Sequence, residues 1–363
     1  MKNIFTSSAE LKKALFRARR QKVKIAGLEL PKLTKEQEGM IKDVWGKVKI
    51  DTRWISHFNR FREEGEPWSP YYVPDPIQYA IFDLYYSNYR RCRVVEDKNL
   101  NSMLFSELIQ PETVLRRISQ NGHGSVFLDA GYKLVTREEA LRLVSGKRVI
   151  VKPSINSGGG HGVLLFDESA MAEEILRAVE KSGDMIVQKV AQQHSAISAL
   201  NPSSLNSIRF VSFIDAEGVH LLSSILRVGG EGAHVDNASS GGVFCGVHND
   251  GTLRRVAHNL RGECFISHPS SGIVFDGYRI PGYQQCCDAV IKLAPRFYGF
   301  SRLISWDLAI ATDGSPMLIE ANMTYGGADI PQIANGPMFG DLTSSVIKEV
   351  FSNKKNVLLS RLL

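Results

Sequence analysis

The chain has 363 residues, of which 43% are hydrophobic and 23% are charged, and these are the proportions of an ordinary globular protein. No apolar run approaches the ~18 residues needed to cross a membrane, and no signal-type apolar segment follows the first residues. Five cysteines, an odd number without regular spacing, do not indicate a disulfide framework, so we expect a reducing, cytoplasmic protein. Cys264 and His268 lie four residues apart without a second such pair, so zinc is not expected.

Positive charge is concentrated at the N-terminus. Residues 1–62 hold 16 Lys and Arg against 6 Asp and Glu, an excess larger than the net charge of +6 of the whole chain, so the remainder is mildly acidic. This distribution argues against a nucleic-acid-binding core. It indicates instead a local surface that meets an anionic partner.

The first predicted element is a basic helix over residues 8–20. Ser8 can cap it, and basic side chains fill the face opposite a short apolar stripe. The stripe consists of Leu11, Ala14, Leu15 and Ala18. Two interpretations stay open. Either the helix docks on its own domain with a solvated basic face, or that face makes a weak peripheral contact with an anionic membrane surface.

Further helices are predicted from capping boxes and from apolar residues at helical spacing. They cover residues 34–49, 79–89, 100–109, 136–144, 168–181, 284–297 and 343–351. Asp167 is expected to cap the helix over 168–181. The aromatic residues of 79–89 are interpreted as core, because no base-contacting motif accompanies them. The proline-rich residues 67–76 are interpreted as a linker or an irregular crossing.

Strands are predicted where apolar residues alternate between turn signals. They cover residues 126–129, 148–152, 162–166, 185–190, 207–214, 219–228, 243–247, 253–257, 304–310 and 316–322. Residues 258–282 are interpreted as an insertion. The pattern predicts an α+β protein that is rich in antiparallel hairpins and lacks the regular βαβ alternation of a doubly wound fold.

A glycine-rich loop follows the strand that ends at Lys152. Residues 154–162 read SINSGGGHG, which lacks both the Gly-Lys-Ser/Thr ending of a Walker A loop and the glycine spacing of a dinucleotide fingerprint. The backbone amides of such a loop can approach phosphate oxygens closely, and a lysine ammonium neutralises their charge. The sequence therefore indicates a loop that covers phosphates. The alternative is a mobile β-turn.

Arg209 lies on the predicted strand over residues 207–214. An arginine on a strand is usually a surface or ion-paired residue. One that points at a metal site would instead clamp a phosphoryl group during its transfer. Both interpretations stay open at this point.

The hairpin over residues 304–322 carries the predicted metal ligands. If the chain turns at its Asp-Gly pair, Asp307 lies opposite Glu320. Asn322 shares the face of Glu320, because side chains alternate along a strand. Two carboxylates and an amide are the oxygen ligands that suit Mg²⁺. The alternative is a hairpin with one solvated polar face.

Taken together and in this order, these motifs resemble the ATP-grasp superfamily, and in particular the sugar-transfer-associated ATP-grasp family. The resemblance covers roughly residues 93–350 and, weakly, residues 70–92. Its most specific pieces are VKP followed by GGGHG at 151–162, NSIR at 206–209, DN followed by GG at 236–242, and WD followed by EAN at 306–322.

The resemblance implies an ATP-grasp fold in which two α+β lobes hold ATP between them. Residues 1–92 would form a basic helical N-terminal segment and a pre-ATP-grasp portion. Residues 93–355 would form the ATP-grasp domain, with a nucleotide lobe at about 93–190 and a metal and acceptor lobe at about 191–355.

The resemblance also implies roles for single residues. Lys98 and Lys152 would contact the ATP phosphates, and Arg209 would stabilise the transferring γ-phosphoryl group. The metal ligands, for two Mg²⁺ ions, would be Asp307, Glu320 and Asn322. The phosphate-covering loop would comprise Ser157, Gly158, Gly159, Gly160, His161 and Gly162.

The adenine-binding hinge implied by the resemblance comprises Gln188, Lys189 and Val190, which would act largely through backbone hydrogen bonds. Family members often carry an acidic residue just past the hinge for the ribose hydroxyls. Residues 191–198 contain none. Gln192, Gln193 or His194 would have to replace it, and His194 is included among the expected nucleotide contacts.

The usual reaction of the family activates a carboxylate as an acylphosphate, with release of ADP, before an amine displaces phosphate. Small-molecule carboxylate and amine substrates are therefore implied and, by analogy, a sugar-linked carboxylate of a surface polysaccharide. The catalytic residues would be Lys152, Arg209 and Asn237. The acceptor is expected at loops 229–242 and 323–335, where the alternative is a pair of solvated turns. Its contacts would be Arg227, Asp236, Asp329 and Gln332.

Two rival functions stay open. The same ATP site would serve a phosphotransferase, in which a hydroxyl or enol takes the phosphoryl group without ligation. A nucleotide-binding scaffold that organises a glycosyltransferase complex would bind ATP without turnover. The presence of all the expected metal ligands argues against the scaffold.

Overall fold

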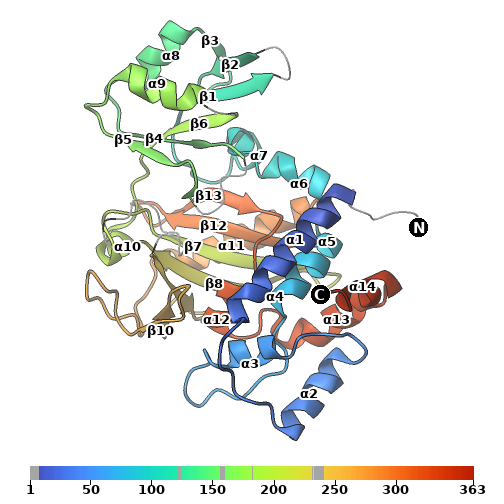
Figure 1. Ribbon diagram of the computed structural model, residues 1–363. Coiled ribbons are helices and arrows are strands. Elements are labelled where there is room, and N and C mark those ends of the chain that lie inside the picture. The colour runs from blue at the N-terminus through green and yellow to red at the C-terminus, as the bar shows by residue number, and fades with distance from the viewer. Residues whose placement is uncertain (1–7, 121–123, 156–159, 182, 231, 233–240) are drawn as a thin grey trace.

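The computed structural model describes residues 8–120, 124–155, 160–181, 183–230, 232 and 241–363, and it is a mixed α+β fold built on two antiparallel sheets (Figure 1). This architecture confirms the predicted fold class. In the part of the chain that is described, no helix combines the length and the apolar character that crossing a membrane requires.

The first sheet has the strand order β3-β2-β1-β6-β4-β5. Its strands are β1 (Thr113–Gln120), β2 (Gly124–Leu128), β3 (Leu134–Val135), β4 (Val149–Pro153), β5 (Leu164–Phe166) and β6 (Met185–Lys189). Helices α8 (Arg137–Val144) and α9 (Ala172–Glu180) cover one face (Figure 1). The core between them consists of side chains such as Val149, Val151 and Val187 from the sheet and Ile175 and Val179 from α9.

This part of the chain contains a strand that was not predicted and a helix cap that was predicted wrongly. Strand β1 was not predicted, because Arg116 and Arg117 interrupt its apolar alternation. In the structure Arg116 is buried, and its guanidinium donates to the carbonyl oxygens of Asn99 at 3.1 Å and Asp129 at 2.7 Å. Asp167 does not cap a helix, since α9 begins later, after Met171.

The second sheet has the strand order β11-β10-β9-β8-β7-β12-β13. Its strands are β7 (Ser207–Ile214), β8 (Val219–Val228), β9 (Val243–Val247), β10 (Leu253–His258), β11 (Cys264–Phe265), β12 (Leu303–Ile310) and β13 (Pro316–Asn322). Successive side chains of β7 enter different cores, because a strand alternates its faces. Phe210 packs with helix α11 (Tyr283–Leu293), and Phe213 packs with the N-terminal and C-terminal helices.

The N-terminal part of the chain is helical. It comprises α1 (Ser8–Ile25), α2 (Lys35–Trp45), α3 (Arg53–Asn59), α4 (Asp75–Ile77), a π-helical turn (Gln78–Phe82), α5 (Asp83–Tyr86), α6 (Tyr89–Val95), a 3₁₀ turn (Lys98–Leu100) and α7 (Asn101–Leu104). The predicted capping box of α2 is present, with Thr34 accepting from the backbone of Gln37. The helix predicted over 100–109 is much shorter, and the run at 79–89 is broken into several turns whose aromatic side chains lie in the core, as interpreted.

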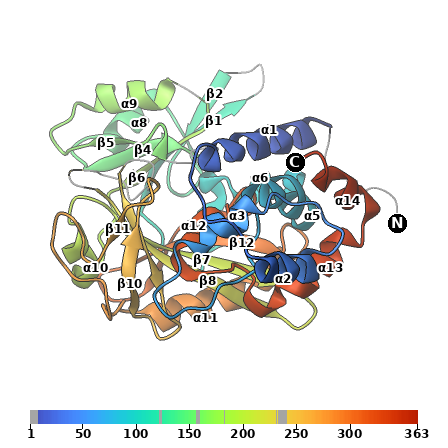
Figure 2. The same ribbon diagram turned by 60° about the horizontal axis from the view of Figure 1, so that its bottom comes forward.

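Helix α1 docks on its own protein. Ala14, Ala18 and Ile25 are buried against the π-helical turn and α4. Figure 2 shows α1 and α3 over the side of the second sheet that α12 (Asp329–Asn335) and α13 (Thr343–Phe351) also cover. The other helices within the described residues are α10 (Ser195–Leu200) and α14 (Lys354–Ser360), neither of which was predicted, and the 3₁₀ turns Ala294–Phe297 and Gly340–Leu342.

Candidate active site

The hairpin of β12 and β13 pairs Asp307 with Glu320, as the sequence predicted. The turn differs from the predicted one, because Ala311 donates its backbone N–H to the Ser315 carbonyl at 2.9 Å and the loop between them is longer. Gly314, with φ +86°, allows this turn. A register shift between Asp307 and Leu308 leaves Ile319 as the extra residue on β13. The longer turn and the bulge compensate each other, so the expected pairing results.

Asp307 is held by cations from neighbouring strands. Arg209 of β7 donates from Nε and Nη2 to the two carboxylate oxygens at 2.8 Å each. Arg227 of β8 approaches to 3.1 Å, and the Asn322 amide donates to the same carboxylate at 3.4 Å. Burial alone would raise the pKa of Asp307, but the two guanidinium groups hold it below its ordinary value. In this structure Arg209 is therefore an ion-paired residue, which is one of the two interpretations that the sequence left open.

Glu320 is held from the other side of the site. The Lys98 ammonium lies 2.7 Å from Glu320 Oε2, and the Lys98 backbone N–H donates to the Ser154 carbonyl, just past β4, at 2.9 Å. Burial opposes ionisation of Glu320, yet Lys98 keeps its pKa below the ordinary value. Burial, and then the nearby Lys98 charge, lower the pKa of Lys152 to about 8. Lys98 and Lys152 from the first sheet region thus meet the hairpin of the second sheet.

The donor set at the hairpin fits Mg²⁺. Asp307, Glu320 and Asn322 present hard oxygen atoms on one face, and Mg²⁺ prefers such ligands in small number. Among the described residues, no three His, Cys, Asp or Glu side chains gather to hold a metal ion, so the Asn322 amide oxygen would have to supply the third protein ligand.

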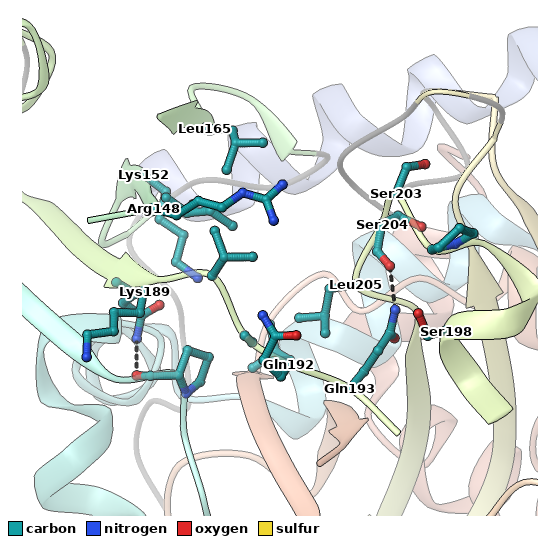
Figure 3. A pocket seen from close by; sticks show the side chains of 17 residues that line it. Arg148, Lys152, Leu165, Lys189, Gln192, Gln193, Ser198, Ser203, Ser204 and Leu205 are labelled. Carbon is teal, nitrogen blue, oxygen red and sulfur yellow. Dashed lines mark hydrogen bonds between the residues drawn. The ribbon is translucent and has the colours of Figure 1, made fainter. Parts of the chain in front are cut away.

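A pocket lies between the first sheet and the segment that follows α10 (Figure 3). One wall is formed by Arg148, Lys152 and Leu165, and the other by Ser203, Ser204 and Leu205. The predicted hinge residues Gln188, Lys189 and Val190 also line it. Lys152 was expected at the nucleotide, but sequence reasoning missed the other wall residues, because their side chains reach the pocket from separate segments.

Two backbone N–H groups of the predicted hinge already donate hydrogen bonds within the protein. Lys189 N–H donates to the Glu112 carbonyl at 2.8 Å, and Val190 N–H donates to the Arg148 carbonyl at 3.3 Å. The Gln188 amide donates to the Pro111 carbonyl at 3.1 Å, and the Lys189 ammonium pairs with the Glu112 carboxylate at 2.8 Å. The Lys189 side chain is therefore directed to Glu112.

The residues expected near the ribose separate into two groups. His194 caps α10, accepting from Ala196 N–H at 3.2 Å, and it does not line the described pocket. Gln193 is tied to Ser204 and Asn206, which it contacts at 2.6 Å and 2.9 Å (Figure 3). Gln192 is exposed and lines the pocket, so it is the better placed of the glutamines.

Several predicted residues lie outside the described part of the chain. They are Ser157, Gly158 and Gly159 of the phosphate-covering loop, and Asp236 and Asn237 of the acceptor loop. Gly160, His161 and Gly162 are described and follow β4 as a turn, with His161 exposed.

The second expected acceptor loop contains a helix. Residues 329–335 form α12, and Asp329 at its start pairs with Lys24 at 2.5 Å. Gln332 is buried, and its amide accepts from Val73 N–H at 2.7 Å and donates to the Val73 carbonyl at 2.9 Å. These contacts fasten α12 to the N-terminal segment, so the structure gives no support to a substrate role for Asp329 or Gln332.

A second pocket adjoins Glu320 and Asn322, and α1 forms part of its wall. Lys13, Arg17 and Tyr325 line it, and none of them was singled out as a site residue. The sequence did contain one signal, since Lys13 and Arg17 are four residues apart and share a helical face.

A family model described as "Sugar-transfer associated ATP-grasp" matches residues 79–348. No curated protein matches. The D-Ala:D-Ser ligase VanG from Enterococcus faecalis is similar at 13% identity over 77% of this chain and 63% of that chain, with a TM-score of 0.41.

Two further solved structures are similar at the same level. One is the biotin carboxylase domain of the 2-oxoglutarate carboxylase from Hydrogenobacter thermophilus, in complex with MgADP, at 14% identity, 74% and 48% coverage and a TM-score of 0.42. The other is the L-amino acid ligase from Bacillus licheniformis, at 14% identity, 70% and 48% coverage and a TM-score of 0.40. The chain thus spans 48–63% of the length of these three proteins. The family match, which covers most of the chain, carries the assignment: the protein belongs to the sugar-transfer-associated ATP-grasp family.

Proposed function

We propose that this protein is an ATP- and Mg²⁺-dependent ligase that joins a carboxylate to an amine through an acylphosphate and releases ADP. The observation that carries the proposal is the pair of cation–carboxylate contacts at the hairpin. There Lys98, expected on the ATP phosphates, lies 2.7 Å from Glu320, an expected metal ligand. The neighbouring strands bring Arg209 to Asp307 in the same place.

The pocket of Figure 3 is the proposed adenine site. Gln188, Lys189 and Val190 line this pocket. Lys152 also lines it and is close enough to Lys98 for the two charges to interact. The triphosphate would run along this line to the hairpin, beneath the loop at 157–162. The nucleotide lobe would comprise about residues 93–190, and the metal and acceptor lobe about residues 191–355.

Asp307, Glu320 and Asn322 would hold two Mg²⁺ ions, whose charge lets an anionic carboxylate approach a triphosphate. Lys98 and Arg209 now neutralise Glu320 and Asp307. With metal and nucleotide present, these two cations would exchange carboxylate oxygens for phosphate oxygens. The cations therefore keep two buried carboxylates ionised, and their release costs little because a new anion replaces the old one.

The chemistry follows from this charge arrangement. A carboxylate oxygen of the substrate attacks the γ-phosphorus, the bond to the ADP oxygen breaks, and ADP leaves. Lys152 and Arg209 stabilise the charge on the phosphoryl group, and the glycine loop excludes water. The amine then attacks the acyl carbon and phosphate departs. Arg227, Asp236 and Asn237 would orient the reactants, and a sugar-linked carboxylate is the proposed substrate class.

ADP release with Mg-ATP, a panel of uronic acids and hydroxylamine tests the proposal. Hydroxamate should form, because hydroxylamine traps an acylphosphate. Glu320→Gln should lower ADP release at least about a hundredfold, since a lost ligand to a catalytic charge removes several kcal/mol of stabilisation. The exposed Glu64→Gln is the control and should change nothing.

Other outcomes of this experiment identify the rivals. ADP release without hydroxamate, with phosphate found on a hydroxyl, indicates a phosphotransferase. Mg-ATP binding without any turnover indicates a scaffold. Full turnover by Glu320→Gln, in a variant whose melting temperature matches the wild type, would remove the metal assignment.

A further inference from the structure

The pocket beside Glu320 and Asn322 has two chemically different ends. At one end lie the expected metal ligands of β13. At the other end lie three basic side chains, Lys13 and Arg17 of α1 and Arg93 of α6. Helix α1 precedes the part of the chain that matches the family model, which begins at residue 79. Lys13 and Arg17 are therefore contributed by the N-terminal segment, and Arg93 by the part of the chain that matches the family model.

The three cations are close enough to affect one another. Partial burial, and then the charges of Arg17 and Arg93, lower the pKa of Lys13. In the part of the chain that the structure describes, no carboxylate lies within ion-pairing distance of Lys13, Arg17 or Arg93. Three cations that repel one another around an open pocket are stabilised by a bound anion.

The acids of the same pocket neutralise its three cations only in part. Glu96 accepts from the backbone N–H groups of Met323 at 3.0 Å and Thr324 at 2.8 Å, and its charge partly opposes the lowering of the Lys13 pKa. Glu10 lies one helical turn before Lys13 and also lines the pocket. Glu320 pairs with Lys98 at 2.7 Å. Two acids, Glu10 and Glu96, therefore face three cations, and a net positive charge remains for an anion.

The basic end is held in place by an aromatic ring. The Arg17 guanidinium carbon lies 3.6 Å from the centre of the Tyr325 ring, and the Lys13 ammonium lies 5.7 Å from it. Tyr89 packs edge-on against the same ring, with centroids 5.1 Å apart. Tyr325 holds Arg17 and, more loosely, Lys13, so a ligand does not have to order these two side chains.

We propose that this pocket binds the carboxylate substrate and that the substrate is at least a dianion. Its reacting carboxylate lies at the Glu320 and Asn322 end, and a second acidic group, a phosphate or another carboxylate, binds Lys13, Arg17 and Arg93. The inference rests on the proposed ligase function and adds the substrate class to it. It also assigns α1 to substrate binding, where the sequence left a solvated or membrane-facing helix as the alternatives.

Matched sugar acids test the inference. Glucuronate has one acidic group, glucarate adds a second carboxylate, and glucuronate 1-phosphate adds a phosphate. Isothermal titration calorimetry should show that at least one of the two dianions binds at least about tenfold more tightly than glucuronate, which corresponds to about 1.4 kcal/mol. The stronger dianion identifies whether the second group is a carboxylate or a phosphate. Equal binding of all three ligands would overturn the inference.

A double variant locates the binding site. Lys13→Gln with Arg93→Gln removes two charges and leaves the Arg17 stacking intact. We expect it to weaken dianion binding at least about tenfold and to leave glucuronate and Mg-ATP binding within about twofold, because only the second acidic group loses its partners. Arg19→Gln, an exposed charge elsewhere on α1, is the matched control and should have no effect.

The binding measurement separates this inference from the proposed ligase function. Preferential dianion binding that the double variant abolishes, without ADP release by any carboxylate, supports the pocket and contradicts the ligase. ADP release in which the double variant keeps the wild-type KM for every sugar acid supports the ligase and contradicts the pocket. Melting temperatures of both variants show whether a loss of binding reflects a loss of folding.

Discussion

At the scale of a single residue, burial brings the ionisation of Lys152 close to neutral pH. Burial and the neighbouring Lys98 lower its pKa to about 8, so above that pH the free protein holds a neutral amine next to the proposed triphosphate path. We expect kcat/KM for ATP to fall as the pH rises through about 8, because this parameter reports ionisation of the free enzyme. Lys152→Arg keeps its charge and should remove this decline. A wild-type profile that stays flat to about pH 9.5 would contradict the assignment.

The buried carboxyl group of Asp83 leads to a prediction about how the stability of the fold depends on pH. Burial raises the pKa of Asp83 to about 7, and one of its oxygens accepts from the Gln78 amide at 2.8 Å while the other has no partner among the described residues. The folded protein therefore keeps a proton that the unfolded chain has released above about pH 4. This contribution to stability is complete below pH 4 and is lost as the pH rises through about 7.

Asp83→Asn should mimic the protonated carboxyl. We expect its melting temperature to exceed that of the wild type by clearly more at pH 8 than at pH 5, because the wild type loses stability over the whole interval between the unfolded and the folded pKa of Asp83. Asp43→Asn, on the exposed side of α2, controls for the loss of a surface carboxylate. An equal shift at both pH values would show that the Asp83 proton does not matter.

Two glycines test how elements pack. Gly246 of β9 lies directly beneath α12, and a Cβ atom there would meet the Ala334 carbonyl oxygen at 2.5 Å and clash with the Asn335 side chain. Gly39 of α2 has no atom within 4 Å of such a Cβ. Gly246→Ala should destabilise the protein by about 1–3 kcal/mol through overpacking.

Gly39→Ala should stabilise the protein by about 1 kcal/mol through helix propensity. Chemical denaturation measures both, and the same sign for both would contradict this view of the packing.

At the scale of the whole molecule, the N-terminal segment and the second sheet share one core. Trp54, Ile55 and Phe58 of α3 are at most 1% exposed and belong to the same buried cluster as Val211 and Phe213 of β7. The predicted boundary near residue 92 therefore does not coincide with a break in this core. The boundary near residue 92 remains a prediction about the functional parts of the chain. It does not imply that the two parts fold independently.

A fragment of residues 79–348, the part that matches the family model, tests this point. The fragment lacks α1, α2, α3 and α4 and also α14, so part of the core that these helices share with the second sheet would be exposed. It should therefore bind a hydrophobic dye and lack a cooperative thermal transition. The full chain is the reference. A fragment that unfolds cooperatively at the melting temperature of the full chain would show that the N-terminal helices contribute little to the fold.

The sequence by itself determined the features that depend on local chemistry. Alternating residues and turn signals predicted most strands, Thr34 and Thr136 predicted their capping boxes, and the facing pair of Asp307 and Glu320 followed from strand alternation. Such patterns act over a few residues, so they can be seen without a fold. Strand β1 was missed because its buried Arg116 is satisfied by distant carbonyl oxygens, which no local pattern reveals.

Only the tertiary structure decided which charges meet. Lys98 and Glu320 are more than two hundred residues apart, and the contacts of Arg17 with Tyr325 and of Lys24 with Asp329 depend on how α1 docks. The sequence marks these residues as charged but does not say which of many opposite charges each one faces. For α1 that choice is made by the apolar surface that buries the helix, because burial drives docking and the charges take the positions that docking gives them.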